Sequence, residues 1–166
     1  MGMNIDDLRK KVYEANMELV ERGLVIYTWG NVSAIDREAG VVAIKPRGIE
    51  YADLEWQDIS VTDLDGNAVD DNPLLPSVDL DYHLAVYKGF KDVGGMAHTH
   101  SVYATVFAQA LKDIPCLGTT HADHFHGDIP CLPYLPEKAV KENYEFNAGQ
   151  QIVEYFTDRG VDPNAM

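Results

Sequence analysis

Residues 94–101 read Gly-Gly-Met-Ala-His-Thr-His-Ser, and the rest of the chain is best interpreted around this stretch. Alternate side chains of a strand point to the same face, so a strand here places His98 and His100 side by side. Neutral imidazoles are ligands of zinc and similar ions. The pair therefore forms either part of a metal site or two polar residues on a solvated face. Its apolar and small neighbours favour the metal site.

Periodic apolar residues predict the elements around this strand. An amphipathic helix is expected from Ile5 to Val20, with Gly23 as its stop. Further helices are expected from Ser77 or Asp79 to about Gly89, and at 102–111 and 137–159, the last broken near Gly149. Strands are expected at 24–28, 32–36, 41–45, 59–64 and 67–69, and the segment 116–132 is expected to be strand and loop. Strands mixed with covering helices predict a layered αβ domain.

Composition limits the function classes. The 166 residues, 46% of them hydrophobic, suit one domain with a real core. A net charge of −14 without a basic cluster argues against nucleic acid as a partner. The sequence has no apolar run that would span a membrane and no signal peptide, which predicts a cytoplasmic protein. Cys116 and Cys131 have neither a metal-type spacing nor a secretory context, so both are expected to be reduced.

Several polar residues are candidates to extend the histidine site. Asp79 lies where a helix begins, just before the histidine strand, so it is either a helix cap or a third metal ligand. Ser77, at the same helix start, either caps the helix or helps to bind an anion. Two turns add donors that suit a phosphate or serve as plain turns: Gly30, Asn31 and Ser33 in one, and Lys45, Pro46, Arg47 and Gly48 in the other.

Residues 118–127 form the segment richest in titratable groups. Asp123 is a candidate proton donor or acceptor that His121 would orient. His124 and His126 form a second His-x-His and thus a rival metal site. The alternative is a polar surface loop. His83, on the second helix, is interpreted as a packing or surface residue rather than a ligand.

Five motifs together resemble the L-ribulose-5-phosphate 4-epimerase family of the class II aldolase/adducin fold. They appear in that family's order: Thr-Trp-Gly-Asn-Val-Ser-Ala at 28–34, Ile-Lys-Pro-Arg-Gly at 44–48, Pro-Ser-Val-Asp at 76–79, His-Thr-His-Ser at 98–101 and Gly-Thr-Thr-His-Ala-Asp at 118–123. The resemblance runs from the first helix to Met166. The last motif favours the epimerases over the related sugar-phosphate aldolases.

The resemblance implies a single domain over residues 1–166, a three-layer αβα sandwich with a mixed, mostly antiparallel central sheet. It also implies one zinc ion per subunit, held by Asp79, His98 and His100, and a phosphorylated ketose that is cleaved and rejoined with inversion of one carbon. Asp123 matches the acid/base aspartate. The positions that hold substrate, mainly its phosphate, are Gly30, Asn31, Lys45, Arg47, Gly48, Ser77 and Val78. A homotetramer with sites near subunit contacts is the implied assembly.

Three departures from the family pattern are visible. Arg47 and Val78 stand where the family has serine; arginine keeps a phosphate-binding charge, whereas valine removes a hydroxyl. The family also continues beyond the position of Met166 into a strand with a third histidine ligand, and later a tyrosine that pairs with the aspartate. The chain is therefore expected to be C-terminally incomplete, with uncovered apolar surface and loss of activity as consequences to test.

The predicted function is a zinc-dependent epimerase that interconverts L-ribulose 5-phosphate and D-xylulose 5-phosphate in pentose (arabinose) catabolism. Two alternatives remain. A class II sugar-phosphate aldolase would release an aldehyde, whereas an adducin-like domain would keep the fold for protein association without catalysis.

Overall fold

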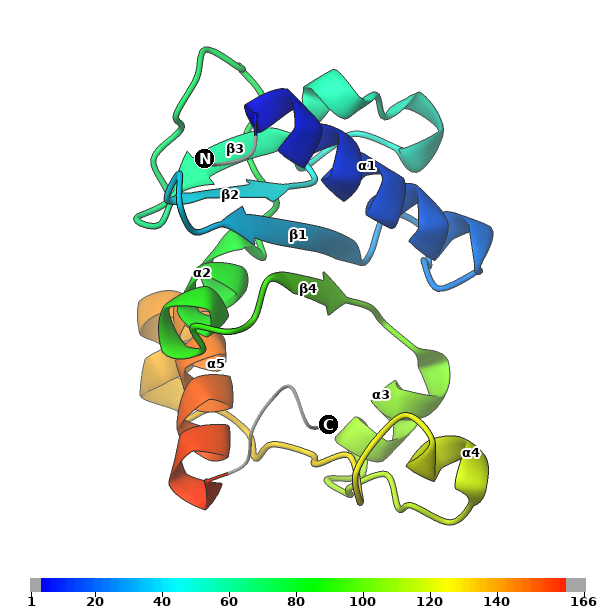
Figure 1. Cartoon of the computed structure of the whole chain (residues 1–166). Coiled ribbons are helices and arrows are strands. Elements are labelled where there is room, and N and C mark those ends of the chain that lie inside the picture. Colours follow the sequence, from blue (N-terminus) through cyan, green and yellow to red (C-terminus); the bar gives the residue numbers. More distant parts are fainter. Residues whose placement is uncertain (1–3, 161–166) are drawn as a thin grey trace.

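A computed structural model describes residues 4–160 of the chain; Met166, where the family resemblance ends, lies outside them (Figure 1). Four strands form one sheet in the order β3-β2-β1-β4, and neighbouring strands pair antiparallel. The strands are β1 (Asn31–Asp36), β2 (Val41–Ile44), β3 (Ser60–Asp63) and β4 (Gly95–His98). The helices are α1 (Ile5–Glu21), η1 (Tyr51–Asp53), η2 (Trp56–Asp58), α2 (Leu80–Gly89), α3 (Val102–Gln109), α4 (Thr119–Ala122) and α5 (Glu137–Arg159).

The sheet is covered on both faces, which confirms the αβα fold class. All four residues of β2 are buried, because alternate side chains enter two different cores. Val41 and Ala43 pack in the core that includes Leu8 and Val12 of α1. Residues 42 and 44 pack in a second core with Leu80, Leu84 and Tyr87 of α2. In Figure 1, α1 covers one face of the sheet, and α2, backed by α5, lies against the other.

The N-terminal helix forms as its apolar spacing predicts. The side chain of Asn4 accepts a hydrogen bond from the backbone of Asp6 and caps the first turn. The helix ends at Glu21, and Gly23 follows with a positive φ of 67°. That conformation suits glycine and confirms the predicted stop.

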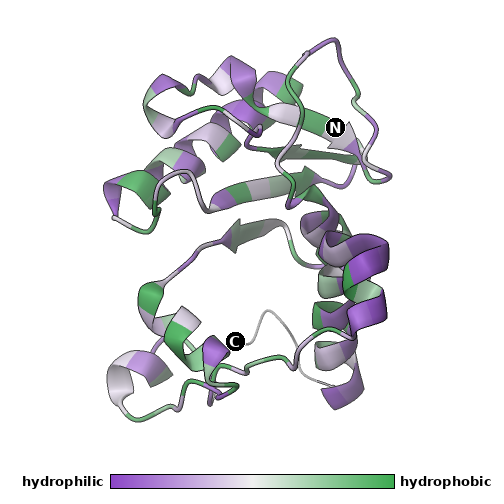
Figure 2. Cartoon of the chain, turned by 180° about the vertical axis from the view of Figure 1, so that it is seen from behind, coloured by the Kyte–Doolittle hydropathy of each residue, from purple (hydrophilic) through white to green (hydrophobic). Residues whose placement is uncertain are grey.

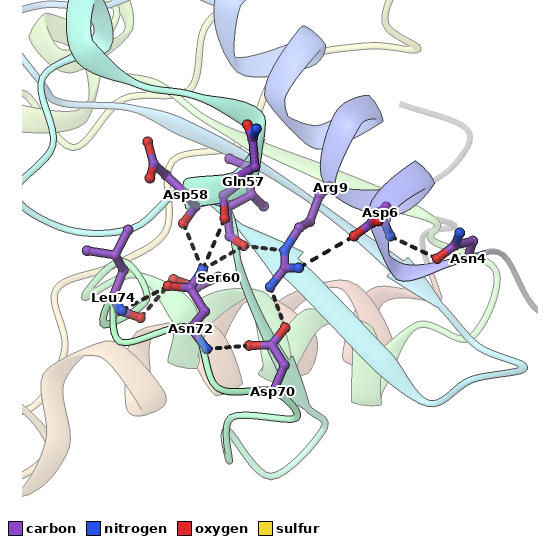
Figure 3. A network of polar contacts seen from close by, with 10 residues as sticks. Asn4, Asp6, Arg9, Gln57, Asp58, Ser60, Asp70, Asn72 and Leu74 are labelled. Atoms are coloured by element: carbon purple, nitrogen blue, oxygen red, sulfur yellow. Dashed lines mark hydrogen bonds and ion pairs between the residues drawn. The ribbon is translucent and has the colours of Figure 1, made fainter.

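Arg9 fastens α1 to the chain around β3 (Figure 3). Its Nε donates to the carbonyl of Ile59 at 2.9 Å, and its guanidinium pairs with Asp70. Asn72 continues the network, since its backbone N–H donates to Asp70 and its amide donates to the carbonyls of Gln57 and Ile59. The loop after β3 is thereby held next to α1, and this loop leads into the segment that precedes α2.

Two glycines allow α5 to pack closely against α2. A Cβ at Gly149 would lie 2.7 Å from the Cβ of Ala85 and 2.9 Å from the Cα of Tyr82, and one at Gly89 would lie 2.5 Å from Val153. The predicted break near Gly149 is wrong. The helix is interrupted instead at Asn143, whose φ of −165° is extended and whose side chain accepts a hydrogen bond from the backbone of the next turn.

Two predicted strands do not form. Residues 24–28 make a turn closed by a single bridge between Ile26 and Trp29, and Tyr27 has a φ of 56°, which no strand residue adopts. The turn at Asp65 and Gly66 is present, but residues 67–69 contribute only one bridge, between Ala68 and Thr62. Only four residues of β3 therefore pair as a regular strand.

The segment 110–134 contains no regular strand and carries α4. Its two Ile-Pro-Cys-Leu tetrapeptides meet each other, because Ile114 and Ile129 exchange backbone hydrogen bonds of 2.9 and 3.0 Å. Asp113 accepts from the N–H of Cys131, and Asp128 accepts from that of Cys116. Both cysteines are free thiols, as predicted.

Apolar side chains are exposed on α3, where no residue is buried. Val102, Tyr103 and Val106 are more than half exposed, and Figure 2 shows the apolar colour of this helix. No helix within residues 4–160 has the length and apolar character needed to cross a membrane.

Candidate functional site

A cleft of about 290 Å³ brings together most of the predicted site. It lies where β1 begins, where β2 ends and where the loop enters α2. The end of β2 and the loop before α2 are joined by two backbone hydrogen bonds, from Ser77 N–H to the carbonyl of Lys45 and from Arg47 N–H to the carbonyl of Leu75. The predicted site residues that line the cleft are Gly30, Asn31, Lys45, Arg47, Gly48, Ser77, Val78, Asp79 and His100.

Asp79 is the polar centre of this cleft. It occupies the N-cap position of α2, yet its side chain makes no capping hydrogen bond. Its Oδ2 instead accepts from Asn31 Nδ2 at 2.7 Å and from Ser77 Oγ at 3.1 Å, and lies 3.3 Å from His98 Nδ1. Burial opposes ionisation, but His98, Asn31 and Ser77 outweigh it and lower the pKa of the carboxyl to about 2. Asp79 is therefore a carboxylate at neutral pH, as a metal ligand must be.

Gly30 sets how closely β1 and β4 approach at the site. Its φ is 109°, and a Cβ here would lie 3.0 Å from the carbonyl oxygen of His98. Its own carbonyl accepts a hydrogen bond of 2.7 Å from Tyr51 Oη. Glycine suits this position, because the positive φ strains other residues and a Cβ would crowd the backbone of His98.

The two histidines lie together, although only one is in the strand. β4 ends at His98, so the prediction of a strand through His100 is wrong by two residues. The rings are nevertheless stacked, with centroids 4.8 Å apart, and Trp29 packs 5.5 Å from the ring of His100. His98 faces a second pocket, which Tyr82 and other residues line.

The ligand types of Asp79, His98 and His100 suit zinc, but their side chains do not converge on one common position. A carboxylate and two imidazoles are ligands that zinc prefers. Within residues 4–160, however, no three His, Cys, Asp or Glu side chains converge closely enough to hold an ion. The structure thus places Asp79, His98 and His100 as neighbours without forming a complete ligand set.

Two cations reach the cleft from the end of β2. Lys45 is only 4% exposed; its Nζ donates to the carbonyl of Ile49 at 2.6 Å and lies 4.8 Å from the ring centroid of Tyr51. Burial lowers its pKa, although Glu50 opposes this effect. Arg47 is exposed and uses Nε to donate to Pro76. Its terminal nitrogens remain suited to an anion in the cleft.

Ser33 does not belong to the cleft, contrary to its interpretation as a phosphate donor. It is fully buried between β1 and α2, where its Oγ lies 2.6 Å from His83 Nδ1 and 2.7 Å from Tyr87 Oη. His83 is also fully buried, and burial lowers its pKa to about 4. Of the two alternatives for His83, a packing or a surface residue, the structure shows the first, and its polar partners were not predicted.

Asp123 lies apart from the cleft. It is exposed at the C-terminal end of the short helix α4, which Figure 1 shows at a distance from β1 and β2. Within the described residues, His121 makes no hydrogen bond with the Asp123 side chain; its Nε2 lies 2.8 Å from the carbonyl of Gly127. His124 and His126 are exposed, and their segment holds no metal cluster within the described residues.

Sequence reasoning assigned no role to Trp29. This side chain lines the cleft beside His100 and is half exposed. Its position inside the Thr-Trp-Gly-Asn motif was the available signal. An indole at the mouth of a polar cleft gives it one apolar wall.

Comparison with known proteins supports the assignment of the fold. Residues 10–166 match the family described as Class II Aldolase and Adducin N-terminal domain. The chain belongs to this family. It is 51% identical over 147 residues to the L-ribulose-5-phosphate 4-epimerase UlaF of Salmonella paratyphi B, and equally so to UlaF of Salmonella typhi. These matches cover 89% of the chain but 64% of each relative, so the chain spans slightly less than two thirds of their length.

Solved structures of the family show the same fold. An L-fuculose 1-phosphate aldolase matches with a TM-score of 0.72 and 24% identity, over 99% of this chain and 92% of that one. YgbL from Klebsiella pneumoniae matches with a TM-score of 0.68 and 25% identity, over 90% and 73% of the two chains. At these identities the structures support the fold rather than a particular substrate.

Proposed function

We propose that this class II aldolase family domain carries the site of a zinc-dependent L-ribulose-5-phosphate 4-epimerase. The observation that carries the proposal is the single cleft in which the Asp79 carboxylate and His100 share a lining with Lys45 and Arg47. Two chemical functions are thereby adjacent: ligands for a Lewis acid and cations for a phosphate. The 51% identity to UlaF favours the epimerase over other activities of the family.

The substrate phosphate is proposed to bind at the end of β2. Arg47 presents a guanidinium that can contact two phosphate oxygens, and Lys45 adds a buried charge beside it. Asn31 and Ser77 also line this part, but their side chains hydrogen-bond Asp79. Their main contribution is therefore to orient that carboxylate, and the phosphate relies on Arg47, Lys45 and the backbone near Gly48.

Asp79, His98 and His100 are proposed to hold the zinc ion. When bound, the ion would act as a Lewis acid and stabilise the negative charge that develops on substrate oxygens as a carbon–carbon bond breaks. The protein residues would keep the cleaved aldehyde in place while it turns its other face. Rejoining the two fragments then gives the inverted carbon.

Asp123 is proposed to exchange the proton of the hydroxyl group on that carbon. A proton donor must come within hydrogen-bonding distance of its substrate. Because Asp123 does not line the cleft within its own chain, this role requires α4 of a second copy to approach the cleft, in keeping with the homotetramer implied by the family resemblance. Light scattering of the purified protein would test this assembly.

The activity test is product analysis with L-ribulose 5-phosphate. Formation of D-xylulose 5-phosphate supports the epimerase, whereas accumulation of a trapped aldehyde without a new pentulose phosphate would assign an aldolase instead. Neither product, with intact zinc binding, would favour an association domain of the same fold.

Metal content gives a separate test with a matched control. We expect zinc close to one per chain, lost when His98 and His100 are both replaced by alanine. The control replaces His124 and His126, the other His-x-His pair, in the same way and should retain the metal. The reverse result would move the metal site to the segment around α4.

A further inference from the structure

A buried chain of polar side chains lies next to the cleft and has no part in the proposed chemistry. Ser33 Oγ stands between His83 Nδ1 and Tyr87 Oη, at 2.6 and 2.7 Å. All three side chains are at most 1% exposed. A buried network of this kind is stable when each of its polar atoms has a partner.

The protons in this chain have one arrangement that uses both hydroxyl groups. If Tyr87 donates to Ser33 and Ser33 donates to His83 Nδ1, each hydroxyl proton meets an acceptor. In the opposite direction, His83 Nδ1–H would donate to Ser33 and Ser33 would donate to Tyr87. The Tyr87 proton could then not be accepted by Ser33 Oγ. A neutral imidazole that accepts at Nδ1 carries its hydrogen on Nε2. Among the described residues, His83 Nε2 is fully buried and has no hydrogen-bond partner.

Asn31, the next residue on this face of β1, carries a buried acceptor that also has no partner among the described residues. Asn31 must direct its Nδ2 to Asp79, because a carboxylate only accepts hydrogen bonds. Its Oδ1 therefore points away from Asp79, and it too is buried without a partner within residues 4–160.

The topology places these two atoms in neighbouring contacts between β1 and α2. Asn31 and Ser33 are on the same face of β1, two residues apart. Their partners Asp79 and His83 are one helical turn apart at the start of α2. Two contacts thus cross the same gap, Asn31 to Asp79 and Ser33 to His83. The donor at Nε2 and the acceptor at Oδ1 come from these adjacent contacts.

We propose that one internal water molecule binds here, accepting from His83 Nε2–H and donating to Asn31 Oδ1. Buried waters commonly satisfy such atoms where protein partners do not reach. The water makes His83 a positioning residue: it fixes the amide of Asn31, which in turn holds the carboxylate of Asp79. Its meaning for catalysis rests on the proposed function, whereas the water site itself depends only on the fold.

Nuclear magnetic resonance of the whole chain with ring-¹⁵N histidine tests the water site directly. We expect His83 as the Nε2–H tautomer, with a rotating-frame Overhauser cross-peak from this hydrogen to a long-lived water. The Nδ1–H tautomer would overturn the proposal, as would an Nε2–H without a water cross-peak. The result is independent of any epimerase activity.

Two variants test the positioning role. His83→Gln keeps a donor near the Nε2 position, whereas His83→Asn keeps only a group near Nδ1 for Ser33. We expect the side-chain amide resonances of Asn31 to stay in place in His83→Gln and to shift in His83→Asn. Circular dichroism confirms that each variant is folded. Any other pattern, above all the reverse one, would overturn the positioning role of His83. If neither variant folds, the water cross-peak of the unchanged protein decides.

Discussion

Substitution of Gly149 by alanine tests whether close contact between α2 and α5 holds the site-bearing helix in place. The new Cβ would lie 2.7 Å from the Cβ of Ala85, 2.9 Å from the Cα of Tyr82 and 3.1 Å from the Tyr82 carbonyl oxygen. None of these atoms can move aside by a rotamer change. The helices must therefore separate.

The magnitude follows from two opposing effects. Overpacking a well-filled contact costs about 1–3 kcal/mol, and replacing glycine by alanine inside a helix returns about 0.5–1 kcal/mol. From the middle of each range, we expect the free energy of unfolding to fall by about 1 kcal/mol. The melting temperature should fall by about 2–4 °C for each kcal/mol. Urea unfolding followed by far-ultraviolet circular dichroism measures this difference.

The control is Gly94→Ala, because no atom lies within 4 Å of a Cβ built there and its φ is not positive. A surface change of this kind is expected to stay within about 0.5 kcal/mol of the parent. Gly89→Ala offers a second comparison, since its new Cβ meets the side chain of Val153 at 2.5 Å. Adding Val153→Ala should restore part of that loss. A Gly149→Ala protein as stable as the parent would refute the close contact.

Three further predictions concern the cleft and the cores. Tyr51→Phe removes the 2.7 Å hydrogen bond to the carbonyl of Gly30, and should lower the free energy of unfolding by about 1–2 kcal/mol in urea titrations. Burial raises the pKa of Tyr51 and that of Tyr87 to about 12, so the folded state keeps protons that the unfolded state loses near pH 10. The free energy of unfolding should therefore fall between pH 10 and 12, by up to about 1.4 kcal/mol per pH unit for each tyrosine. An unchanged melting temperature over this range would contradict the burial of these side chains. Arg47→Ala should weaken binding of inorganic phosphate about tenfold in calorimetric titrations, the loss of one charged hydrogen-bonding group, whereas Arg22→Ala on the exposed end of α1 should leave it unchanged.

The parts of the fold that follow from local patterns were predictable. Apolar spacing and the stop at Gly23 correctly predicted α1. The β-rich runs predicted β1, β2 and β3, with ends that differ from the observed ones by one or two residues at most. The prediction of a strand at 24–28 failed because a β-rich composition does not reveal that Tyr27 adopts a left-handed conformation in a turn. The prediction of a break in α5 near Gly149 failed for a related reason. Glycine at 149 serves close packing, and Asn143 is the residue that caps the second half of the helix.

The residues that line the cleft were predicted in part, because they occur in motifs whose family resemblance brings them together. Spacing alone did not decide whether Asp79 is a helix cap or a metal ligand. In the structure its side chain makes no capping hydrogen bond and instead contacts Asn31 and His98. The partnership of Ser33 with His83 was not predictable, since 50 residues separate them and each side chain alone suits an ordinary role. Whether Asp123 reaches the cleft depends on assembly, which the sequence of one chain does not encode locally.

The register of one strand pair links the sheet to the chemistry. Asn31 lies opposite His98 in the pairing of β1 with β4, and both side chains meet at Asp79 of α2. A slip of one residue would turn Asn31 to the other face of the sheet, toward α1, and would remove its contact with Asp79. Gly30 allows the two strands to approach at this point, and the glycines between α2 and α5 hold the helix that supplies the carboxylate. The geometry of Asp79 is therefore fixed from three directions, by a strand register, by a glycine that brings β4 close and by a helix contact. This explains why a packing change at Gly149, on a helix that supplies no residue to the cleft, should also displace the carboxylate at its centre.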